Sequence, residues 1–340
     1  MVSEALTRHA PRISEYVSAF EARLANVTLC AKSSTPSCSS QWLRFEDAWR
    51  KNESNAMLSR LRRHASEYDE FLPEANRTTM NSPKRQKKTI FSYFAPLYNC
   101  GNAAMRSAAT GADGGKWLCG EVVRPCRVLS VGSNYDDSFE QAMHNMSGCR
   151  SYTVDPTLGR HSRPEVRAFE KKLRDRSGSI LNATVGVGYG HLRDRHTAKH
   201  QLLPVARLLA GSGGFFATRP GRDREAALPS AAAPHTYRMS IAKIDGEGAE
   251  FDGGFLGDEG LWRLCMDGTL SVDQVTAELH ARQSARFGGL RSVNAIFEGA
   301  ALCGMVLHRQ EINYYGCHFG GCVEYAWVSL AQLRRTLGLA

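Results

Sequence analysis

Two short strings place acids and small residues directly after apolar runs that read as buried strands. The first is Val128-Leu129-Ser130-Val131-Gly132-Ser133-Asn134, and the second is Lys243-Ile244-Asp245-Gly246-Glu247-Gly248-Ala249-Glu250. In an open α/β sheet, ligands bind beyond the carboxyl ends of the strands, where helix N-termini also point. The two strings therefore predict one ligand site at one edge of a sheet.

The second string crowds three acids, Asp245, Glu247 and Glu250, beyond a single strand. Repulsion among the acids destabilises the fold unless they contact cations, hydrogen-bond donors or a substrate. The alternative is an acidic turn that is simply exposed to solvent. Glu278 and His280 end the next expected strand. His280 is the best-placed general base of the chain, against the alternative of a histidine that only holds the strand end.

Alternating strand and helix patterns surround these strings. The expected strands cover residues 127–131, 151–154, 179–185, 240–244 and 272–279, and the expected helices cover 138–146, 163–176, 202–209 and 285–302. This alternation predicts a parallel, doubly wound sheet of the Rossmann-like kind. The last two apolar runs, 305–310 and 323–330, are joined by a Gly-rich turn too short for a helix, so they should pair antiparallel. The expected α/β fold is a mostly parallel seven-stranded sheet with a C-terminal antiparallel hairpin.

The chain divides near residue 100. Residues 1–99 are polar and helix-prone and include a stretch rich in Pro, Asn and Lys, which predicts a helical N-terminal accessory region and linker. Residues 100–340 carry the α/β pattern and form the expected main domain. Within this domain, residues 211–237 are rich in Gly, Ala and Pro and predict a surface insertion.

Composition narrows the class of protein. The 340 residues are 42% hydrophobic and 23% charged, which is typical of a globular protein with a sizeable core. No window approaches the roughly 18 uninterrupted apolar residues of a membrane helix, so no membrane span is expected. Lys and Arg number 43 against 34 Asp and Glu, a net charge of +9 that is too diffuse to indicate a nucleic-acid partner. The basic run 84–88 reads as a solvated linker rather than a polyanion site.

The ten cysteines form no Cys-x-x-Cys pair, so neither a structural zinc nor any other metal is expected. Cys317, His318 and Cys322 could converge on a metal, but a disulfide or two free thiols in a Gly-rich hairpin is the favoured interpretation. We expect partial pairing of the thiols from Cys100 onward, in the segments before the first strand and around Cys317 and Cys322.

Asn-x-Ser/Thr sequons are unusually frequent and indicate an oxidising, glycosylating compartment. They begin at Asn26, Asn52, Asn76, Asn145 and Asn182. The stretch Met1–Glu4 lacks the basic and apolar regions of a signal peptide, so either the sequons are chance matches or the true N-terminus lies upstream. The expected protein is soluble, with a secretory or Golgi lumen and the cytoplasm as the two open locations.

Several short motifs follow one another in a particular order. They are Lys116-Trp117-Leu118-Cys119, Val131-Gly132-Ser133-Asn134, Ser138-Phe139-Glu140, Val154-Asp155-Pro156, Lys243 to Glu250, Glu278-Leu279-His280 and Cys322-Val323-Glu324-Tyr325. In this order they resemble S-adenosylmethionine-dependent methyltransferases of the FkbM-like group and the related eukaryotic methyltransferase-like proteins. The first-strand motif V-G-[AS]-N and the fourth-strand motif K-I-D-[IVG]-E-G-x-E of that family carry the resemblance, which covers residues 116–330.

The resemblance implies S-adenosylmethionine as the cofactor. Gly132 would let the backbone approach its methionine part, and the amides of Ser133 and Asn134 with the helix N-terminus would hold its carboxylate. Asp155 would accept hydrogen bonds from both ribose hydroxyls, against the alternative that Asp155-Pro156 only initiates a turn. The resemblance also implies that Asn182 lines the adenine pocket, that Asp245 lies beside the methionine end and that Glu247 orders the pocket.

The expected function is methyl transfer to a hydroxyl of a small molecule or glycan, with His280 and Glu278 as the catalytic pair. A divalent ion shared by Asp245 and Glu278 is a less favoured variant. Two other functions stay open: an NAD(P)-dependent oxidoreductase, and a methyltransferase-like binding module without catalysis. Tyr135-Asp136 stands where a second glycine of the family's Gly-x-Gly-x-Gly pattern often lies, which is a departure from that pattern. The incomplete Gly-x-Gly-x-x-Gly argues against the oxidoreductase.

Overall fold

The computed structural model describes about half of the chain, mainly in the part after residue 114. The described residues are 22, 37–49, 94, 96, 98–100, 105–107, 115–133, 135–155, 163–175, 179–181, 184–185, 202–203, 205–212, 214–218, 237–246, 248, 250–251, 255–257, 260–280, 290–313 and 322–339.

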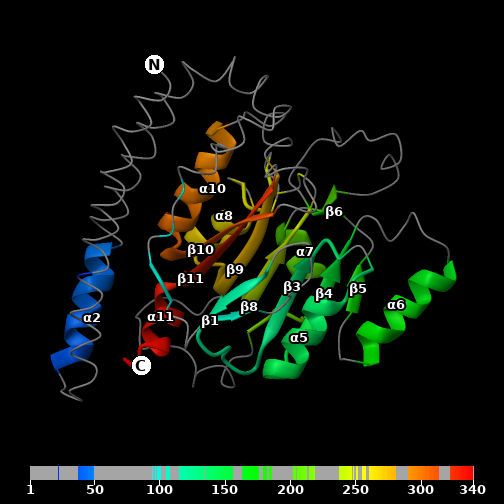
Figure 1. The fold of residues 1–340 in the computed structure, drawn as a ribbon, viewed down its shortest axis with the longest axis horizontal. Helices are drawn as coiled ribbons and strands as arrows, with labels where there is room; N and C mark the ends of the chain where they lie inside the picture. The colour runs from blue at the N-terminus through cyan, green and yellow to red at the C-terminus, as the bar shows by residue number, and fades with distance from the viewer. Residues whose placement is uncertain are drawn as a thin grey trace.

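A mostly parallel sheet forms the centre of the molecule (Figure 1). Its strands, in spatial order, are β10 (Met305–Asn313), β11 (Cys322–Ser329), β9 (Leu270–His280), β8 (Tyr237–Ile244), β3 (Arg127–Val131), β4 (Arg150–Val154) and β5 (Ser179–Leu181). β11 runs antiparallel to both of its neighbours, and the pairs from β9 to β5 are parallel. The expected mostly parallel α/β sheet with antiparallel C-terminal strands is confirmed.

Some element boundaries differ from the expected ones because short apolar runs do not distinguish strand from helix. The run expected as one strand over 179–185 is divided into β5 and β6 (Thr184–Val185), and β6 pairs with β7 (Leu202–Leu203) in a separate sheet. The helix expected over 202–209 is α7, which covers Val205–Gly211. Two further helices were not expected: α8 (Leu261–Met266) and α11 (Leu330–Thr336).

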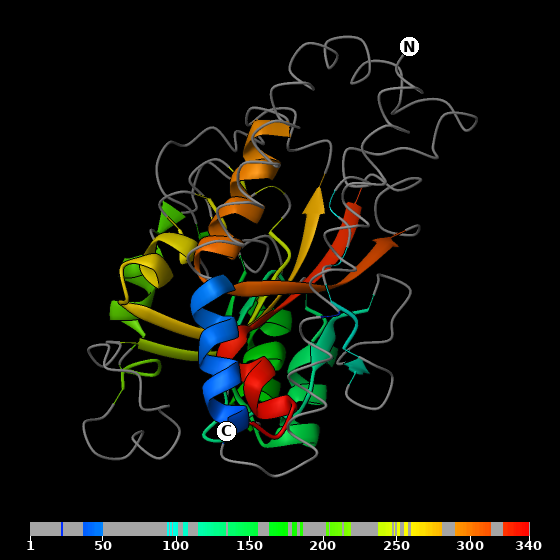
Figure 2. The same ribbon diagram turned by 90° about the vertical axis from the view of Figure 1, so that its left-hand side faces the viewer.

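The two faces of the sheet differ in chemistry, since side chains alternate along each strand. One face buries Leu129, Val131 and Ile244 in a large apolar cluster with residues of α7, α8 and α10 (Leu290–Leu302). The opposite face, here called the polar face, carries Ser130 and Lys243 with further buried polar residues. Figure 1 and Figure 2 show α8 and α10 on the apolar side and α5 (Ser138–Ser147) and α11 on the polar side. One face of the sheet therefore packs in an apolar core, while the buried polar groups on the other face need hydrogen-bonding or ionic partners.

Two elements from early in the chain cover the polar face. β2 (Trp117–Cys119), paired with β1 (Met105–Ser107), contacts β9 and β11, and the Cys119 N–H donates to Gln274 Oε1 at 2.7 Å. Trp42 of helix α2 (Ser37–Ala48) and Trp49 just after it are completely buried in a cluster with Val306, Val328 and Leu333. Residues 37–49 of the expected accessory region thus share a core with the C-terminal strands.

The start of the expected surface insertion is also part of the core. Phe216 is fully buried in the large apolar cluster, and its carbonyl accepts a hydrogen bond from the Arg238 N–H at 2.8 Å. Residues 219–236 of the insertion lie outside the described part of the chain.

Disulfides tie several of these elements together. Cys100 pairs with Cys119 of β2, and Cys126 before β3 pairs with Cys149 before β4. Cys322 at the start of β11 is also disulfide-bonded, while Cys317 lies outside the described residues. The expected pairing before the first strand is confirmed, as is the expectation that Cys322 is oxidised.

Gly132 is the point where the ends of three strands meet. Its N–H donates to the Val154 carbonyl at 2.9 Å, and the Asp245 N–H donates to the Val131 carbonyl at 2.9 Å. Gly132 has a φ of +75°, and a Cβ at this position would lie 1.7 Å from the Asp245 carbonyl oxygen. The glycine is therefore required by the close approach of the backbone after β8, whatever ligand binds there.

We expect Gly132→Ala to lower the free energy of unfolding by about 2–5 kcal/mol, because the substitution adds overpacking to the strain of a left-handed backbone. Gly268→Ala is the matched control: Gly268 has a φ of +71° and open space around its Cβ position, so it should lose only about 1–2 kcal/mol. Denaturant unfolding of both variants measures the difference, and equal losses would refute the close-approach explanation.

Candidate functional site

Backbone register places acids from several strands in one row along the edge of the sheet, which we call the acid row. Glu311 pairs with Glu324, and Glu324 pairs with Glu278. Asp245 follows Ile244, the partner of Ala277, so it lies in line with Glu278. From β10 to β4 the complete row is Glu311, Glu324, Glu278, Asp245, Gly132 and Asp155. Like charges directly opposite each other are destabilising, so this row needs cations or protons.

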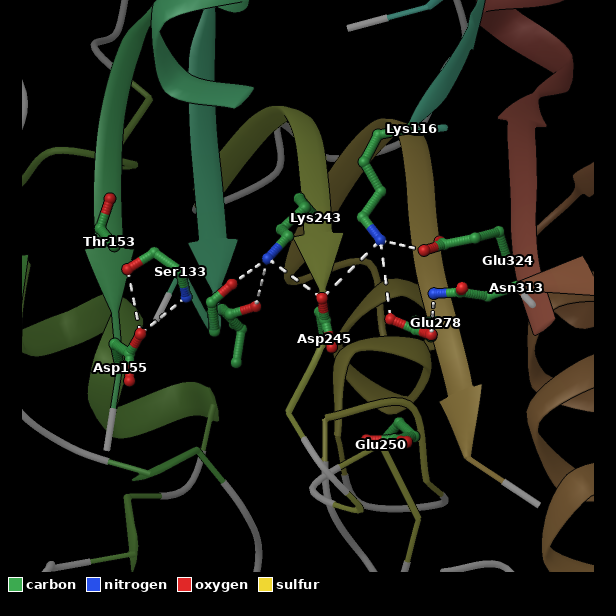
Figure 3. A network of polar contacts seen from close by, with 12 residues as sticks. Lys116, Ser133, Thr153, Asp155, Lys243, Asp245, Glu250, Glu278, Asn313 and Glu324 are labelled. Atoms are coloured by element: carbon green, nitrogen blue, oxygen red, sulfur yellow. Dashed lines mark hydrogen bonds and ion pairs between the residues drawn. The ribbon is translucent and has the colours of Figure 1, made fainter. Parts of the chain in front are cut away.

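Lys116, the residue before β2, supplies the first cation. Its buried ammonium forms a hydrogen-bonded ion pair with Glu324 and lies 3.7 Å from Asp245 Oδ2 and 3.9 Å from Glu278 Oε2. Figure 3 shows the amine among these three carboxylates. Burial alone would lower the pKa of Lys116, but the attraction of Glu324, Asp245 and Glu278 outweighs it and raises the pKa. Lys116 is therefore a permanent cation in the site.

Lys243 supplies the second cation and joins the ends of β8 and β3. Its ammonium lies 3.6 Å from Asp245 Oδ2 and donates to the carbonyl oxygens of Gly132 and Val131 (Figure 3). Burial would raise the pKa of Asp245, but Lys243 and Lys116 lower it below its usual value. Asp245 is therefore an ionised carboxylate, and its side chain keeps 19% of its surface exposed.

Glu278 and Glu324 hold protons more tightly than ordinary carboxyls. Burial, reinforced by Asp245 and Glu324, raises the pKa of Glu278 to about 8. Burial likewise raises the pKa of Glu324 to about 7. Asn313 at the end of β10 donates to Glu278 Oε1 at 2.8 Å. The site thus combines an ionised Asp245 with neighbouring carboxyls that exchange protons near neutral pH.

His280 is fixed by Glu250. The fully buried Glu250 carboxylate accepts from His280 Nδ1 at 2.5 Å and from the His280 N–H at 3.2 Å. Its second oxygen accepts from the Gly248 N–H at 2.9 Å. A carboxylate on Nδ1 selects the tautomer that leaves Nε2 as an acceptor, and Nε2 lies 4.0 Å from Asp245 Oδ1. The imidazole therefore presents its basic nitrogen to the acid row.

Asp155 lies at the other end of the row. Its Oδ2 accepts from the Ser133 N–H at 2.7 Å and from Ser133 Oγ at 3.0 Å (Figure 3). The side chain of Asp155 is fully buried. The carboxylate therefore already shapes the loop after β3, and a ligand hydroxyl would share it with Ser133.

The structure thus brings six of the expected site residues to one edge: Gly132, Ser133, Asp155, Asp245, Glu278 and His280. The other three expected residues, Asn134, Asn182 and Glu247, lie outside the described part of the chain. The residues that sequence reasoning missed or left without a role are Lys116, Lys243, Glu250, Asn313 and Glu324. Lys116 and Glu324 stood in recognised motifs, but only the strand register and the path of β2 show that they meet.

A thiolate metal site at this edge does not fit the chemistry of the described residues. Glu278, His280 and Cys322 have potential ligand atoms within 4.8 Å of one another. Cys322 is disulfide-bonded, however, and a disulfide sulfur is not a thiolate ligand. The space between Asp245 and Glu278, where a shared ion was a less favoured expectation, receives the Lys116 ammonium.

No helix within the described ranges is long and apolar enough to cross a membrane.

Comparison with known proteins yields only distant structural similarity. No family model matches the chain, and no curated protein matches it. The N-methyltransferase NodS from Bradyrhizobium japonicum WM9 matches with 8% identity over 60% of this chain and 85% of its own, at a TM-score of 0.30.

Two other methyltransferases are similar at the same level. The bifunctional kinase-methyltransferase WbdD matches with 12% identity over 61% of this chain and 35% of its own, at a TM-score of 0.32. The O-methyltransferase NcsB1 of neocarzinostatin biosynthesis, solved with S-adenosylmethionine and 2-hydroxy-5-methyl naphthoic acid, matches with 10% identity over 60% and 48%, at 0.25. The chain spans less than half of both proteins, and scores this low do not carry a functional argument.

We expect Lys116→Met to lower the free energy of unfolding by about 3–5 kcal/mol at pH 8, because it leaves the acid row without its central cation. The loss should shrink at pH 5, where Glu278 and Glu324 are protonated. Lys172→Met, on the exposed surface of α6 (Arg163–Asp175), is the control and should change little. A pH-independent loss would mean that Lys116 acts through packing alone.

Stability should fall as pH rises through the pKa of Glu278. The folded pKa of about 8 exceeds the ordinary value of 4.5, so the folded state binds more protons than the unfolded state between these values. The contribution is complete below pH 4.5 and is lost toward pH 8, with a slope of up to about 1.4 kcal/mol per pH unit. Glu278→Gln keeps the acceptor for Asn313 and should flatten the profile. An unchanged slope in urea unfolding across this range would contradict the shifted pKa.

Proposed function

We propose that this protein is an S-adenosylmethionine-dependent methyltransferase of the FkbM-like kind that methylates a hydroxyl of a small molecule or glycan. The observation that carries the proposal is the convergence of Asp155, Gly132 and Asp245 at the ends of three adjacent strands, β4, β3 and β8. The antiparallel β11 between β10 and β9 agrees with a methyltransferase-type sheet.

The residues at this edge fit the cofactor. Asp155 would hold the ribose hydroxyls, and the turn at Gly132 and Ser133 would lie against the methionine part. The ionised Asp245 beside them suits a ligand that carries a sulfonium and an ammonium group. When bound, S-adenosylmethionine supplies an activated methyl group for in-line displacement, so the protein has mainly to position the acceptor.

His280 is the proposed base for the acceptor hydroxyl. Glu250 accepts the hydrogen bond from Nδ1–H and so fixes the tautomer in which Nε2 carries no proton. Nε2 can therefore act as the proton acceptor. Glu278, two residues earlier on the same face of β9, can take up or release a proton near neutral pH because burial raises its pKa to about 8. Proton removal by His280 and exchange through Glu278 would complete a hydroxyl methylation.

One observation favours a binding module without catalysis as the second candidate. Asp155 is fully buried, and the acid row is satisfied by Lys116 and Lys243 of the chain itself. Such self-sufficient polar networks can be structural. Calorimetry with S-adenosylhomocysteine and NAD side by side, followed by methyl transfer to a panel of hydroxyl acceptors, separates the candidates. Binding of NAD alone would favour an oxidoreductase, and binding of S-adenosylhomocysteine without turnover would favour the module.

Asp155→Asn should weaken S-adenosylhomocysteine binding by about 1–3 kcal/mol, because the charged acceptor for the ribose is lost while an oxygen remains for the Ser133 N–H. Isothermal calorimetry measures the change, and a melting temperature near that of the wild type shows that the fold persists. Asp175→Asn at the exposed end of α6 is the control. Unchanged affinity in folded Asp155→Asn would remove Asp155 from the cofactor site.

His280→Asn should lower turnover by about 10²–10⁴-fold and leave cofactor affinity nearly unchanged, because a positioned base contributes that much. Glu250→Gln should lower turnover less and shift the pH profile, since it alters the hydrogen bond that fixes the imidazole. His144→Asn on α5 is the matched control. Turnover per folded molecule that survives His280→Asn would show that the histidine only holds the strand end.

A further inference from the structure

The cysteines of the described residues are mostly oxidised. Cys100, Cys119, Cys126, Cys149 and Cys322 are disulfide-bonded, while Cys265 and Cys303 are thiols outside any disulfide. The Cys126–Cys149 pair is buried among Val128, Phe139 and Met143, so it is part of the core that joins β3, β4 and α5. Buried structural disulfides form and persist in oxidising compartments and are rare in the cytosol.

Asn145 is the one sequon asparagine within the described residues, and it lies on the outer surface. Helix α5 turns Phe139, Met143 and Ser147 toward the core, while Asn145 is exposed. At 3.6 residues per turn, Asn145 lies almost opposite Met143 and Ser147 on the helix. The asparagine of the sequon Asn145-Met146-Ser147 is therefore presented to solvent, while Ser147 is buried, and Asn145 lies four residues from an oxidised Cys149.

We propose that this protein folds in the lumen of a secretory compartment and carries an N-linked glycan on Asn145. The donor is a lipid-pyrophosphate oligosaccharide, and an oligosaccharyl transferase catalyses the step. The Asn145 amide nitrogen forms a bond to C1 of the first sugar, and the bond from C1 to the pyrophosphate oxygen breaks. The lipid pyrophosphate leaves with the electron pair, and the amide loses one proton. In the same compartment, a protein disulfide accepts two electrons and two protons for each cysteine pair formed.

The glycan would leave the acid row accessible. Helix α5 begins at Ser138, just after the turn that contains Gly132 and Ser133, and Asn145 lies in its last turn. A helical rise of 1.5 Å per residue puts about 10 Å between Ser138 and Asn145 along the axis, away from the site. The modification is therefore independent of the proposed methyl transfer, and neither result decides the other.

The test uses protein isolated from its native source, with free thiols alkylated and no reductant. Trypsin should release residues 89–106, 117–127 and 128–150 as one species, joined through Cys100–Cys119 and Cys126–Cys149. Treatment with a glycan-removing amidase in heavy-oxygen water should convert Asn145 into labelled aspartate. Asn134 in the same peptide is the internal control, because Asn134-Tyr135-Asp136 is no sequon and should stay unlabelled.

Labelled aspartate at position 145 in the disulfide-linked peptide is the expected result. An unlabelled Asn145 in that peptide would overturn the glycan, and alkylation of all ten cysteines without reduction would overturn the luminal compartment. In the native host, Ser147→Ala should abolish the label and the loss of electrophoretic mobility, while Ser147→Thr should preserve both. Retention of the modification in Ser147→Ala would also refute the proposal.

Discussion

The ammonium of Lys116 allows carboxylates of three adjacent strands to lie side by side at a buried sheet edge. Glu324, Glu278 and Asp245 come from β11, β9 and β8, and their mutual repulsion would otherwise open the edge. β2 must therefore lie over the polar face both to pack against the sheet and to bring the Lys116 ammonium to the three carboxylates. The Cys100–Cys119 disulfide at the end of β2 secures the segment that delivers this cation.

A second constraint acts on the backbone. Gly132 lets the chain after β8 approach the end of β3 so closely that any side chain would collide with the Asp245 carbonyl. Lys243 donates hydrogen bonds to the Val131 and Gly132 carbonyls and forms an ion pair with the Asp245 carboxylate. The same ammonium therefore holds the backbone of the turn and neutralises the nearby acid. A ligand at this edge would meet a preorganised surface, because the groups that contact it are already held by strands and buried ions.

The edge is divided between two kinds of chemistry. On the β3 and β4 side, Asp155 and Ser133 offer hydrogen-bonding groups. On the β9 and β11 side, His280, Glu278 and Glu324 form a group in which protons move near neutral pH, since burial raises the pKa values of both glutamates. Hydrogen-bonding groups and proton-exchanging groups therefore lie on neighbouring strands of one sheet.

The sequence by itself determined the strand and helix alternation, the antiparallel pairing of the final strands, and the two strings that contain Gly132 and Asp245. Local periodicity and short turns contain that information. It did not determine that Lys116 meets Glu324, that Glu250 holds His280, or that residues 37–49 complete the core under α11. These contacts join segments that lie from about thirty to nearly three hundred residues apart, and they depend on which strands become neighbours and in which register. Only the tertiary structure decides that, because register and chain path are set by the packing of the whole sheet.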